Sequence, residues 1–187
     1  MRIEKLDNQI SLVLFDVDGV MTDGTIYMSE SGEVIKAFNV KDGLAIELLR
    51  SHNIKTGVIS GKSSPALSKR CEQLGFDVVI TGCKNKLPRL YKLSDELDIA
   101  LENIAFCGDD VLDLPIFSVV GLSVAPPDAH QLVLERADWV SNLPGGKGMV
   151  REFVDDLLQL QTGGNLSEIY VPLMNKISKD DVQTLEQ

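Results

Sequence analysis

Two aspartates, Asp16 and Asp18, directly follow an apolar run in the stretch LVLFDVDGVMTDG, which spans residues 12–24. Carboxylates this close repel each other, and each is costly to remove from water. We therefore expect either a positive charge beside them or a chemical task for one of them. One carboxylate can act as a nucleophile while the other transfers a proton, so the pair indicates covalent and acid–base chemistry at the end of a buried strand.

A second acidic cluster follows another apolar run in NIAFCGDDVLD, where Asp109 and Asp110 are adjacent and Asp113 comes about one helical turn later. The carboxyl ends of parallel strands meet at one edge of a sheet, so we expect the two clusters to converge there. Carboxylates from two strands form an all-oxygen site for a hard cation. Mg²⁺ fits such a site, because it is typically held by one or two carboxylates together with phosphate oxygens and water.

Groups that could bind a phosphate come from two more segments. The stretch TGVISGK places Ser60 and Gly61 after a predicted strand, and Lys86, in CKNK, lies at the start of a predicted helix. A hydroxyl and the backbone N–H groups of the following turn can bind phosphate oxygens. A cation, a lysine and such N–H groups together neutralise a phosphoryl group during its transfer.

The elements that position these residues follow from the hydrophobic pattern, in which short apolar runs alternate with helical patterns. This alternation predicts an α/β fold with a doubly wound, mostly parallel sheet. The predicted strands are 11–16, 55–60, 77–80, 104–107, 119–124 and 137–140, and the predicted helices are 42–52, 63–74, 85–98, 110–118, 128–134 and 147–160.

One segment departs from this alternation. Residues 24–39, GTIYMSESGEVIKAFN, alternate with period two around ESGE, which predicts a β-hairpin that stands over the acidic strand end as a flap. The domain is expected to span 1–161. The TGGN that follows is typical of a linker, so 162–187 is expected to be a polar C-terminal tail, in which SKDD at 178–181 could cap a short helix.

The composition of the whole chain narrows the class of protein. It has 187 residues, 44% of them hydrophobic, which is enough for one domain with a sizeable core. The net charge of −10 argues against nucleic acid or an anionic membrane as a partner. No apolar run approaches the ~20 residues of a membrane span. The three cysteines form no CxxC motif, which indicates a reducing, cytoplasmic setting without a zinc site.

The sequence also resembles a known family. DVDGV, ISG, the lysine of CKNK and GDDVLD are similar to the four motifs of the haloacid dehalogenase superfamily, and the similarity runs from about residue 11 to 160. Longer stretches, such as DVDGVMTDGTIYM, GEVIKAFNVKDG and GGKGMVRE, resemble the 3-deoxy-D-manno-octulosonate 8-phosphate phosphatase family. The resemblance implies a Rossmann-like fold without a cap domain, Mg²⁺ as cofactor, a homotetramer, and a role in lipopolysaccharide precursor synthesis.

The resemblance also implies a role for each motif residue. Asp16 would be the nucleophile that forms an aspartyl-phosphate, and Asp18 would be the general acid and base. Mg²⁺ would be held by Asp16, by the main-chain carbonyl of Asp18 and by Asp109. The phosphoryl-binding residues would be Ser60 and Lys86, and the supporting acids would be Asp110 and Asp113.

Two cations in a basic stretch are candidates for substrate choice. Residues 41–92 contain ten Lys or Arg and four Asp or Glu, which gives +6 in an acidic chain. Lys62 stands where the family often has arginine, and Arg70 follows eight residues later. Since the flap is small, the wall around the substrate is expected to come from a neighbouring subunit. We expect Lys62 and Arg70 of that subunit to bind the carboxylate of a phosphorylated sugar acid.

Three other functions are compatible with these motifs. Close relatives with the same motifs hydrolyse sialic-acid-type nonulosonate 9-phosphates. A phospho-accepting receiver module also places acidic residues, a hydroxyl and a lysine around Mg²⁺, but it accepts phosphate at the end of its third strand, whereas DVDG ends the first strand here. A catalytically idle scaffold subunit is the third possibility, and the intact motif residues argue against it.

Overall fold

A six-stranded parallel sheet forms the centre of the computed structural model, which describes residues 6–179. The strand order β5-β4-β1-β6-β7-β8 places the first strand in the middle. Phe15 at the end of β1 lies opposite Val58 of β4 and Cys107 of β6, so three carboxyl ends lie side by side. The strands are β1 (Leu12–Phe15), β4 (Lys55–Ile59), β5 (Val78–Ile80), β6 (Ile104–Cys107), β7 (Leu122–Ala125) and β8 (Trp139–Val140).

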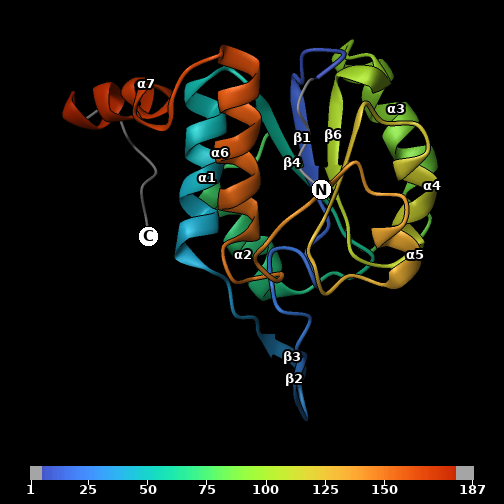
Figure 1. Ribbon diagram of the computed structural model, residues 1–187. Helices are drawn as coiled ribbons and strands as arrows, with labels where there is room; N and C mark the ends of the chain where they lie inside the picture. Colours follow the sequence, from blue (N-terminus) through green and yellow to red (C-terminus); the bar gives the residue numbers. More distant parts are fainter. Residues whose placement is uncertain (1–5, 180–187) are drawn as a thin grey trace.

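Helices cover both faces of the sheet (Figure 1). On one face α1, α6 and α7 pack against one another, and α3, α4 and α5 lie together on the other (Figure 1). The helices are α1 (Val40–Ser51), α2 (Pro65–Leu74), α3 (Leu87–Leu97), α4 (Leu114–Phe117), α5 (Gln131–Leu134), α6 (Met149–Thr162) and α7 (Leu166–Ser178), with the 3-10 helices η1 (Leu101–Asn103) and η2 (Val111–Asp113).

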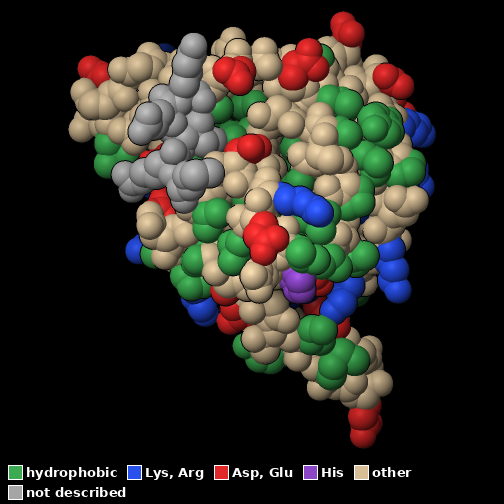
Figure 2. Space-filling model, turned by 45° about the vertical axis from the view of Figure 1, so that its right-hand side comes forward, with side chains coloured by type: hydrophobic (Ala, Val, Ile, Leu, Met, Phe, Trp, Pro, Cys, Tyr) green, Lys and Arg blue, Asp and Glu red, His purple; other side chains and the backbone are tan. Residues whose placement is uncertain are grey.

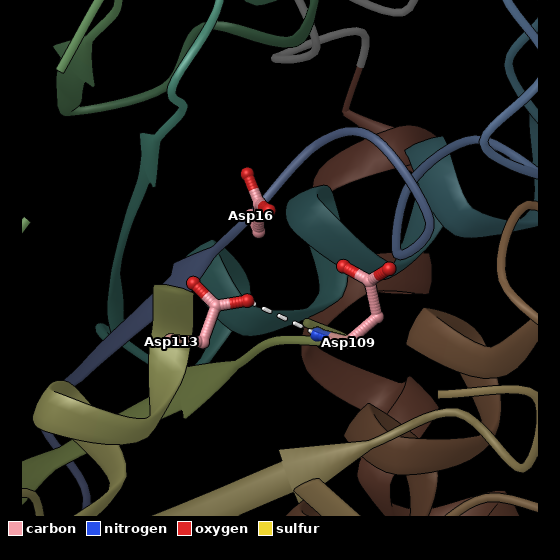
Figure 3. A group of neighbouring side chains, drawn as sticks. All are labelled: Asp16, Asp109 and Asp113. Atoms are coloured by element: carbon pink, nitrogen blue, oxygen red, sulfur yellow. Dashed lines mark hydrogen bonds between the residues drawn. The ribbon is translucent and has the colours of Figure 1, made fainter. Parts of the chain in front are cut away.

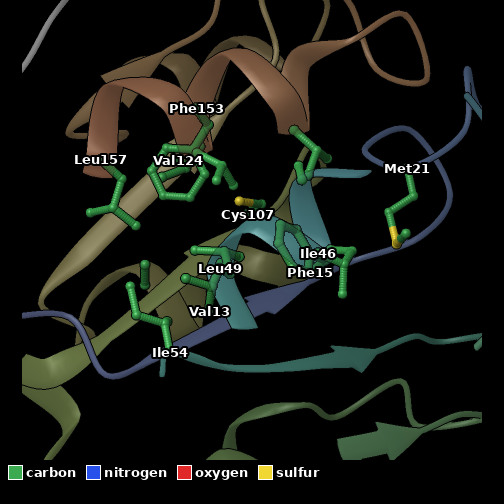
Figure 4. Close-up of a cluster of buried hydrophobic side chains, with 14 of the residues drawn as sticks. Val13, Phe15, Met21, Ile46, Leu49, Ile54, Cys107, Val124, Phe153 and Leu157 are labelled. Atoms are coloured by element: carbon green, nitrogen blue, oxygen red, sulfur yellow. The ribbon is translucent and has the colours of Figure 1, made fainter. Parts of the chain in front are cut away.

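The core has two halves because the side chains of a strand alternate between the faces of the sheet. Val13 and Phe15 point into the half that α1 and α6 cover, whereas Leu12 and Leu14 point into the other half. Figure 4 shows the first half, where Phe153 from α6 packs over the sheet. All four residues of β1 are fully buried, so the strand that precedes the acidic pair is held from both sides.

The flap is an antiparallel hairpin of β2 (Tyr27–Ser29) and β3 (Gly32–Ile35). It projects away from the body of the molecule (Figure 1), and hydrophobic side chains lie on its exposed surface (Figure 2). The predicted hairpin at 24–39 is therefore confirmed. Residues 16–54, all of which the structure describes, contain only this flap and α1, so no cap domain is inserted there.

The predicted doubly wound, mostly parallel sheet is also confirmed. Several elements are shorter than predicted, and two of these differences have a clear physical cause. The helix expected at 110–118 is divided into η2 and α4, and Pro115, which lacks an N–H, lies in the first turn of α4. The strand expected at 119–124 begins only at Leu122, because Val119 and Val120 form a turn in which both N–H groups donate to the Ile116 carbonyl.

The segment after residue 162 contains more structure than the expected polar tail. Asn165 and Glu168 form a capping box that begins α7. Ile169 and Leu173 of α7 are buried in the core half beside α1 and α6. Ser178 ends α7, and the short helix expected around 178–181 falls largely outside the described residues. Among residues 6–179, no helix has the length and apolar character needed to cross a membrane.

Candidate active site

Asp16 stands directly after β1 and is fixed by the sheet. Its backbone N–H continues the β-ladder by donating to the Cys107 carbonyl at 2.8 Å. One carboxylate oxygen, Oδ1, accepts the Val17 N–H at 2.7 Å. The other, Oδ2, lies 3.0 Å from Lys86 Nζ, and the Asp16 side chain is 13% exposed. The carboxylate is therefore held in one orientation and still reaches solvent, as a nucleophile requires.

Lys86 reaches this carboxylate from the position directly before α3. Its side chain is 2% exposed, and Nζ also lies 2.7 Å from Asp113 Oδ1. Burial alone would lower the pKa of Lys86, but the charges of Asp16 and Asp113 outweigh burial and raise it. Lys86 is therefore a permanent cation between two carboxylates, and it can also face an incoming phosphoryl group.

Asp113 is fully buried and organises the second acidic segment. Its Oδ2 accepts the backbone N–H of Asp109 at 3.1 Å, the contact drawn in Figure 3. Asp110 begins η2 as its N-cap: its Oδ1 accepts the Val111 N–H at 2.6 Å, and its own N–H donates to Asp113. Asp110 is exposed, so it supports the turn and does not enter the acidic cluster.

The carboxylates of Asp16, Asp109 and Asp113 form the cluster shown in Figure 3. One oxygen of each lies within 4.8 Å of the others. Among the described residues, Asp109 Oδ1 is buried without a hydrogen-bond partner. Burial, reinforced by the neighbouring acids, raises the pKa of Asp109 to about 8, and burial raises that of Asp16 to about 6 against the opposing effect of Lys86. Such a cluster fits a divalent cation, which would bind the free oxygen and relieve the repulsion.

The loop after Asp16 approaches Asp109 so closely that only glycine fits. Gly19 has φ +90°, and a Cβ there would lie 2.1 Å from Asp109 Oδ2. A second glycine, Gly145, presses on the same loop, because its Cβ would lie 1.8 Å from the Gly19 carbonyl oxygen. Both the glycine of DVDG and the GGKG segment lie in stretches that resemble the family, but the contact between them is visible only in the structure.

The phosphate-binding candidates lie at the same edge. Ser60 follows β4, the neighbour of β1, and is 1% exposed. Its Oγ accepts the Lys62 N–H at 3.2 Å, which folds the turn through Gly61. The Lys62 side chain is exposed, so within this chain only its backbone contributes to the turn. Ser60 thus has the expected position beside the Asp16 strand end.

Arg70 packs against α1 and is not among the residues that form the acidic cluster. It belongs to α2, and its guanidinium carbon is 5.8 Å from the centre of the Phe38 ring. Its Nη2 lies 2.6 Å from the point where a Cβ on Gly43 would stand, so the arginine rests on α1. Among the described residues, its Nε is buried without a hydrogen-bond partner.

Asp18 is not one of the three clustered acids, and it contacts a residue that sequence reasoning missed. Its Oδ1 forms an ion pair with Lys36 Nζ, and Lys36 directly follows β3 of the flap. Lys36 also pairs with Glu33 at 2.7 Å. Lys36 lies inside the hairpin range expected from the sequence, but nothing in the period-two pattern indicated that it would fold back onto Asp18.

Comparisons with known proteins lead to one group of enzymes. A family model described as haloacid dehalogenase-like hydrolase matches residues 79–151. The chain is 46% identical over 159 residues to the 3-deoxy-D-manno-octulosonate 8-phosphate phosphatase of Salmonella typhi, which covers 85% of this chain and 84% of the relative.

Solved structures give the same result. The crystal structure of 3-deoxy-D-manno-octulosonate 8-phosphate phosphatase from Yersinia pestis superposes with a TM-score of 0.79 at 42% identity, over 82% of this chain and 83% of that one. The phosphatase from Moraxella catarrhalis, in complex with a magnesium ion, a phosphate ion and KDO, has a TM-score of 0.79 at 34% identity, over 82% of this chain and 88% of that one.

Proposed function

This chain belongs to the family of 3-deoxy-D-manno-octulosonate 8-phosphate phosphatases, which are haloacid dehalogenase-like hydrolases, and we propose that it hydrolyses that sugar-acid phosphate. The products are the free sugar acid, a lipopolysaccharide precursor, and inorganic phosphate. The observation that supports the proposal most directly is the arrangement of Lys86 between Asp16 and Asp113, beside the free oxygen of Asp109. This arrangement provides a nucleophile, a fixed cation and a metal site at one edge of the sheet.

In the first step, a carboxylate oxygen of Asp16 forms a bond to phosphorus. The bond between phosphorus and the sugar oxygen breaks, and the carboxyl group of Asp18 donates its proton to that leaving oxygen. Lys86 and the Ser60 turn bind the phosphoryl oxygens and keep the reacting atoms aligned. The step yields the free sugar acid and an aspartyl-phosphate.

In the second step, water attacks the phosphorus of the aspartyl-phosphate. The Asp18 carboxylate accepts a proton from this water, the bond to Asp16 breaks, and inorganic phosphate leaves. Both aspartates return to their starting states, so atoms and charges balance over the cycle. The cofactor is Mg²⁺, and Asp16, the Asp18 carbonyl and Asp109 would hold it; when bound, it supplies positive charge to the phosphoryl oxygens.

Phosphate release from a panel of sugar-acid phosphates tests the function. We expect the highest kcat/KM for 3-deoxy-D-manno-octulosonate 8-phosphate, dependence on added Mg²⁺, and loss of turnover in excess EDTA. A higher kcat/KM for a sialic-acid-type 9-phosphate would overturn the substrate assignment. Stable phosphorylation without release would indicate a receiver-like module, and no reaction with any phosphomonoester would indicate an idle scaffold.

The proposal includes a homotetramer located in the cytoplasm. The flap exposes hydrophobic side chains, including Met28, which is 70% exposed, and Ile35, which is 62% exposed. Such a surface is typical of a contact between copies of a chain. In that assembly, Lys62 and Arg70 of a neighbouring subunit would bind the substrate carboxylate. The cytoplasmic setting is supported by the three cysteines, all described and none in a disulfide.

A further inference from the structure

Lys36 directly follows a hairpin whose strands are largely exposed, yet its own side chain is buried. Its neighbours Val34 and Ile35 are 50% and 62% exposed, whereas the Lys36 side chain is 1% exposed. Lysine is rarely buried unless its charge is paired. Lys36 is paired twice, with Asp18 and with Glu33, so its buried position depends on these two carboxylates.

The ion pair joins the flap to the reaction centre. Lys36 directly follows β3, while Asp18 belongs to the loop that leaves β1. Glu33, on β3 itself, lies 2.7 Å from Lys36 Nζ and is 13% exposed, so it fixes the lysine against the hairpin. The result is a chain of charges from the flap to one oxygen of Asp18.

Part of the Asp18 carboxyl group remains accessible to a substrate. Lys36 binds Oδ1, and 23% of the Asp18 side chain remains exposed. One oxygen can therefore be anchored while the rest of the carboxyl group faces the leaving oxygen of a substrate. Lys86 does the same for the neighbouring carboxylate, since it anchors Oδ2 of Asp16. Each of the two reacting aspartates thus has its own lysine.

We propose that Lys36 is a positioning residue, which acts through Asp18 to orient the proton donor toward the leaving oxygen. This inference rests on the proposed function, because it assumes that Asp18 protonates the leaving group. It adds a role for the flap: the hairpin supplies the cation that holds the general acid, and Glu33 holds that cation in place.

The test uses two leaving groups. An alkoxide such as the sugar oxygen needs a proton as it departs, whereas p-nitrophenolate needs almost none. Lys36→Met and Lys36→Gln should lower kcat/KM for the sugar-acid phosphate by roughly 10- to 100-fold, a part of the ~10²–10⁴-fold that general acid catalysis supplies. For p-nitrophenyl phosphate the loss should stay below about threefold, because kcat/KM reports the steps up to formation of the aspartyl-phosphate. Lys36→Arg keeps a cation and should restore most of the loss.

A double-mutant cycle separates positioning from direct substrate contact. If Lys36 acts through Asp18, adding Lys36→Met to Asp18→Asn should change kcat/KM by less than about twofold, because the group that it orients is already gone. If Lys36→Met lowers kcat/KM by the same factor in the Asp18→Asn background as in the wild type, the proposal is overturned, and Lys36 contacts the substrate directly. Equal losses on both leaving groups would also overturn it and indicate a purely structural role.

The matched control is Lys41→Met, which removes an exposed lysine five residues along the chain. It should leave both kcat/KM values unchanged, and circular dichroism of every variant should match the wild type. Lys36→Gln decides the outcome if Lys36→Met does not fold. Wild-type turnover of the sugar-acid phosphate is measured in the same assay. A wild type without activity would contradict the proposed function itself. An active wild type whose Lys36 variants lose kcat/KM equally on both substrates would contradict only this inference.

Discussion

Lys86 Nζ lies 2.7 Å from Asp113 Oδ1, and both side chains are almost completely buried. Asp113 uses its other oxygen to accept the Asp109 N–H, so one buried acid links Lys86, the proposed phosphate-binding lysine, to Asp109, a proposed metal ligand. The arrangement explains why the GDDVLD motif needs a carboxylate after its first two acids. The third acid fixes the lysine and the turn at the same time.

Removal of Asp113 should therefore destabilise the fold as well as impair catalysis. In Asp113→Ala, a buried lysine loses one partner and two backbone N–H groups lose their acceptor. Breaking a buried ion pair typically costs about 3–5 kcal/mol, and we expect a loss of unfolding free energy near the lower end because Asp16 still faces Lys86. Urea denaturation measures this loss. Asp110→Ala, which removes an exposed acid of the same turn, should cost about 0.5–2 kcal/mol as a lost helix cap; equal losses for both variants would contradict the role of Asp113.

Asp16→Asn should abolish turnover and leave a folded protein. The amide keeps the size of the side chain but is no longer a nucleophile, so no aspartyl-phosphate can form. Rapid-quench labelling with radioactive phosphate should mark the wild type and not this variant. Asp18→Asn should lose ~10²–10⁴-fold in kcat. Asp23→Asn, a surface change in the same loop, should keep full activity; more than about a per cent of activity in Asp16→Asn would refute the covalent mechanism.

Gly19→Ala should disrupt the metal site through a steric contact. The new Cβ would lie 2.1 Å from Asp109 Oδ2 at a φ of +90°, so either the loop or the carboxylate has to move. We expect the Mg²⁺ concentration for half-maximal activity to rise on the order of tenfold, or turnover to be lost. Gly24→Ala is the matched control, because Gly24 has φ +75° but its Cβ would approach atoms no closer than 3.8 Å. Similar effects of both changes would attribute the loss to backbone strain alone.

Binding of Mg²⁺ should depend on pH in a direction set by the acidic cluster. The pKa of Asp109 is raised to about 8 and that of Asp16 to about 6, both mainly by burial. A pKa that is higher in the folded than in the unfolded protein means that, without metal, the contribution of these groups to stability falls as pH rises from about 4 to 8. Mg²⁺ needs the ionised carboxylates and displaces their protons.

Titration calorimetry and thermal melts can check this dependence. The half-saturating Mg²⁺ concentration should fall on the order of tenfold or more between pH 6 and pH 8, with release of protons on binding. The increase in melting temperature caused by Mg²⁺ should grow over the same range. Asp109→Asn should remove most of both effects. A Mg²⁺ affinity that does not change between pH 6 and pH 8 would contradict this account of the cluster.

The position of the site could be predicted from the sequence because it follows from the topology of a parallel sheet. Strand ends of a parallel sheet converge, so acids after two apolar runs had to meet, and the Asp16, Asp109 and Asp113 cluster confirms this. The ion pair of Lys36 could not be predicted, because it depends on how an irregular segment folds back from the flap. The last helix was missed for another reason: its apolar residues do not mark a single face, since Ile169 and Leu173 are buried whereas Leu166, Val171 and Met174 are exposed. It also contains Pro172, which is unusual inside a helix.

Substrate choice should depend on Arg70 and on assembly together. Within one chain Arg70 rests on Phe38 and Gly43, with a buried Nε that has no partner among the described residues. In a tetramer this guanidinium can bind the substrate carboxylate in a neighbouring site, a charge-assisted contact of roughly 1.5–3 kcal/mol. Arg70→Ala should therefore lower kcat/KM for the sugar-acid phosphate by about 10- to 150-fold, with little effect on p-nitrophenyl phosphate, which lacks a carboxylate.

Lys69→Ala, at an exposed neighbouring position, should leave both values unchanged. Light scattering should show a tetramer for the wild type and for both variants. A fully active monomer would refute a site shared between subunits, and an Arg70→Ala enzyme that loses equally on both substrates would show that the arginine serves the fold instead of the substrate carboxylate.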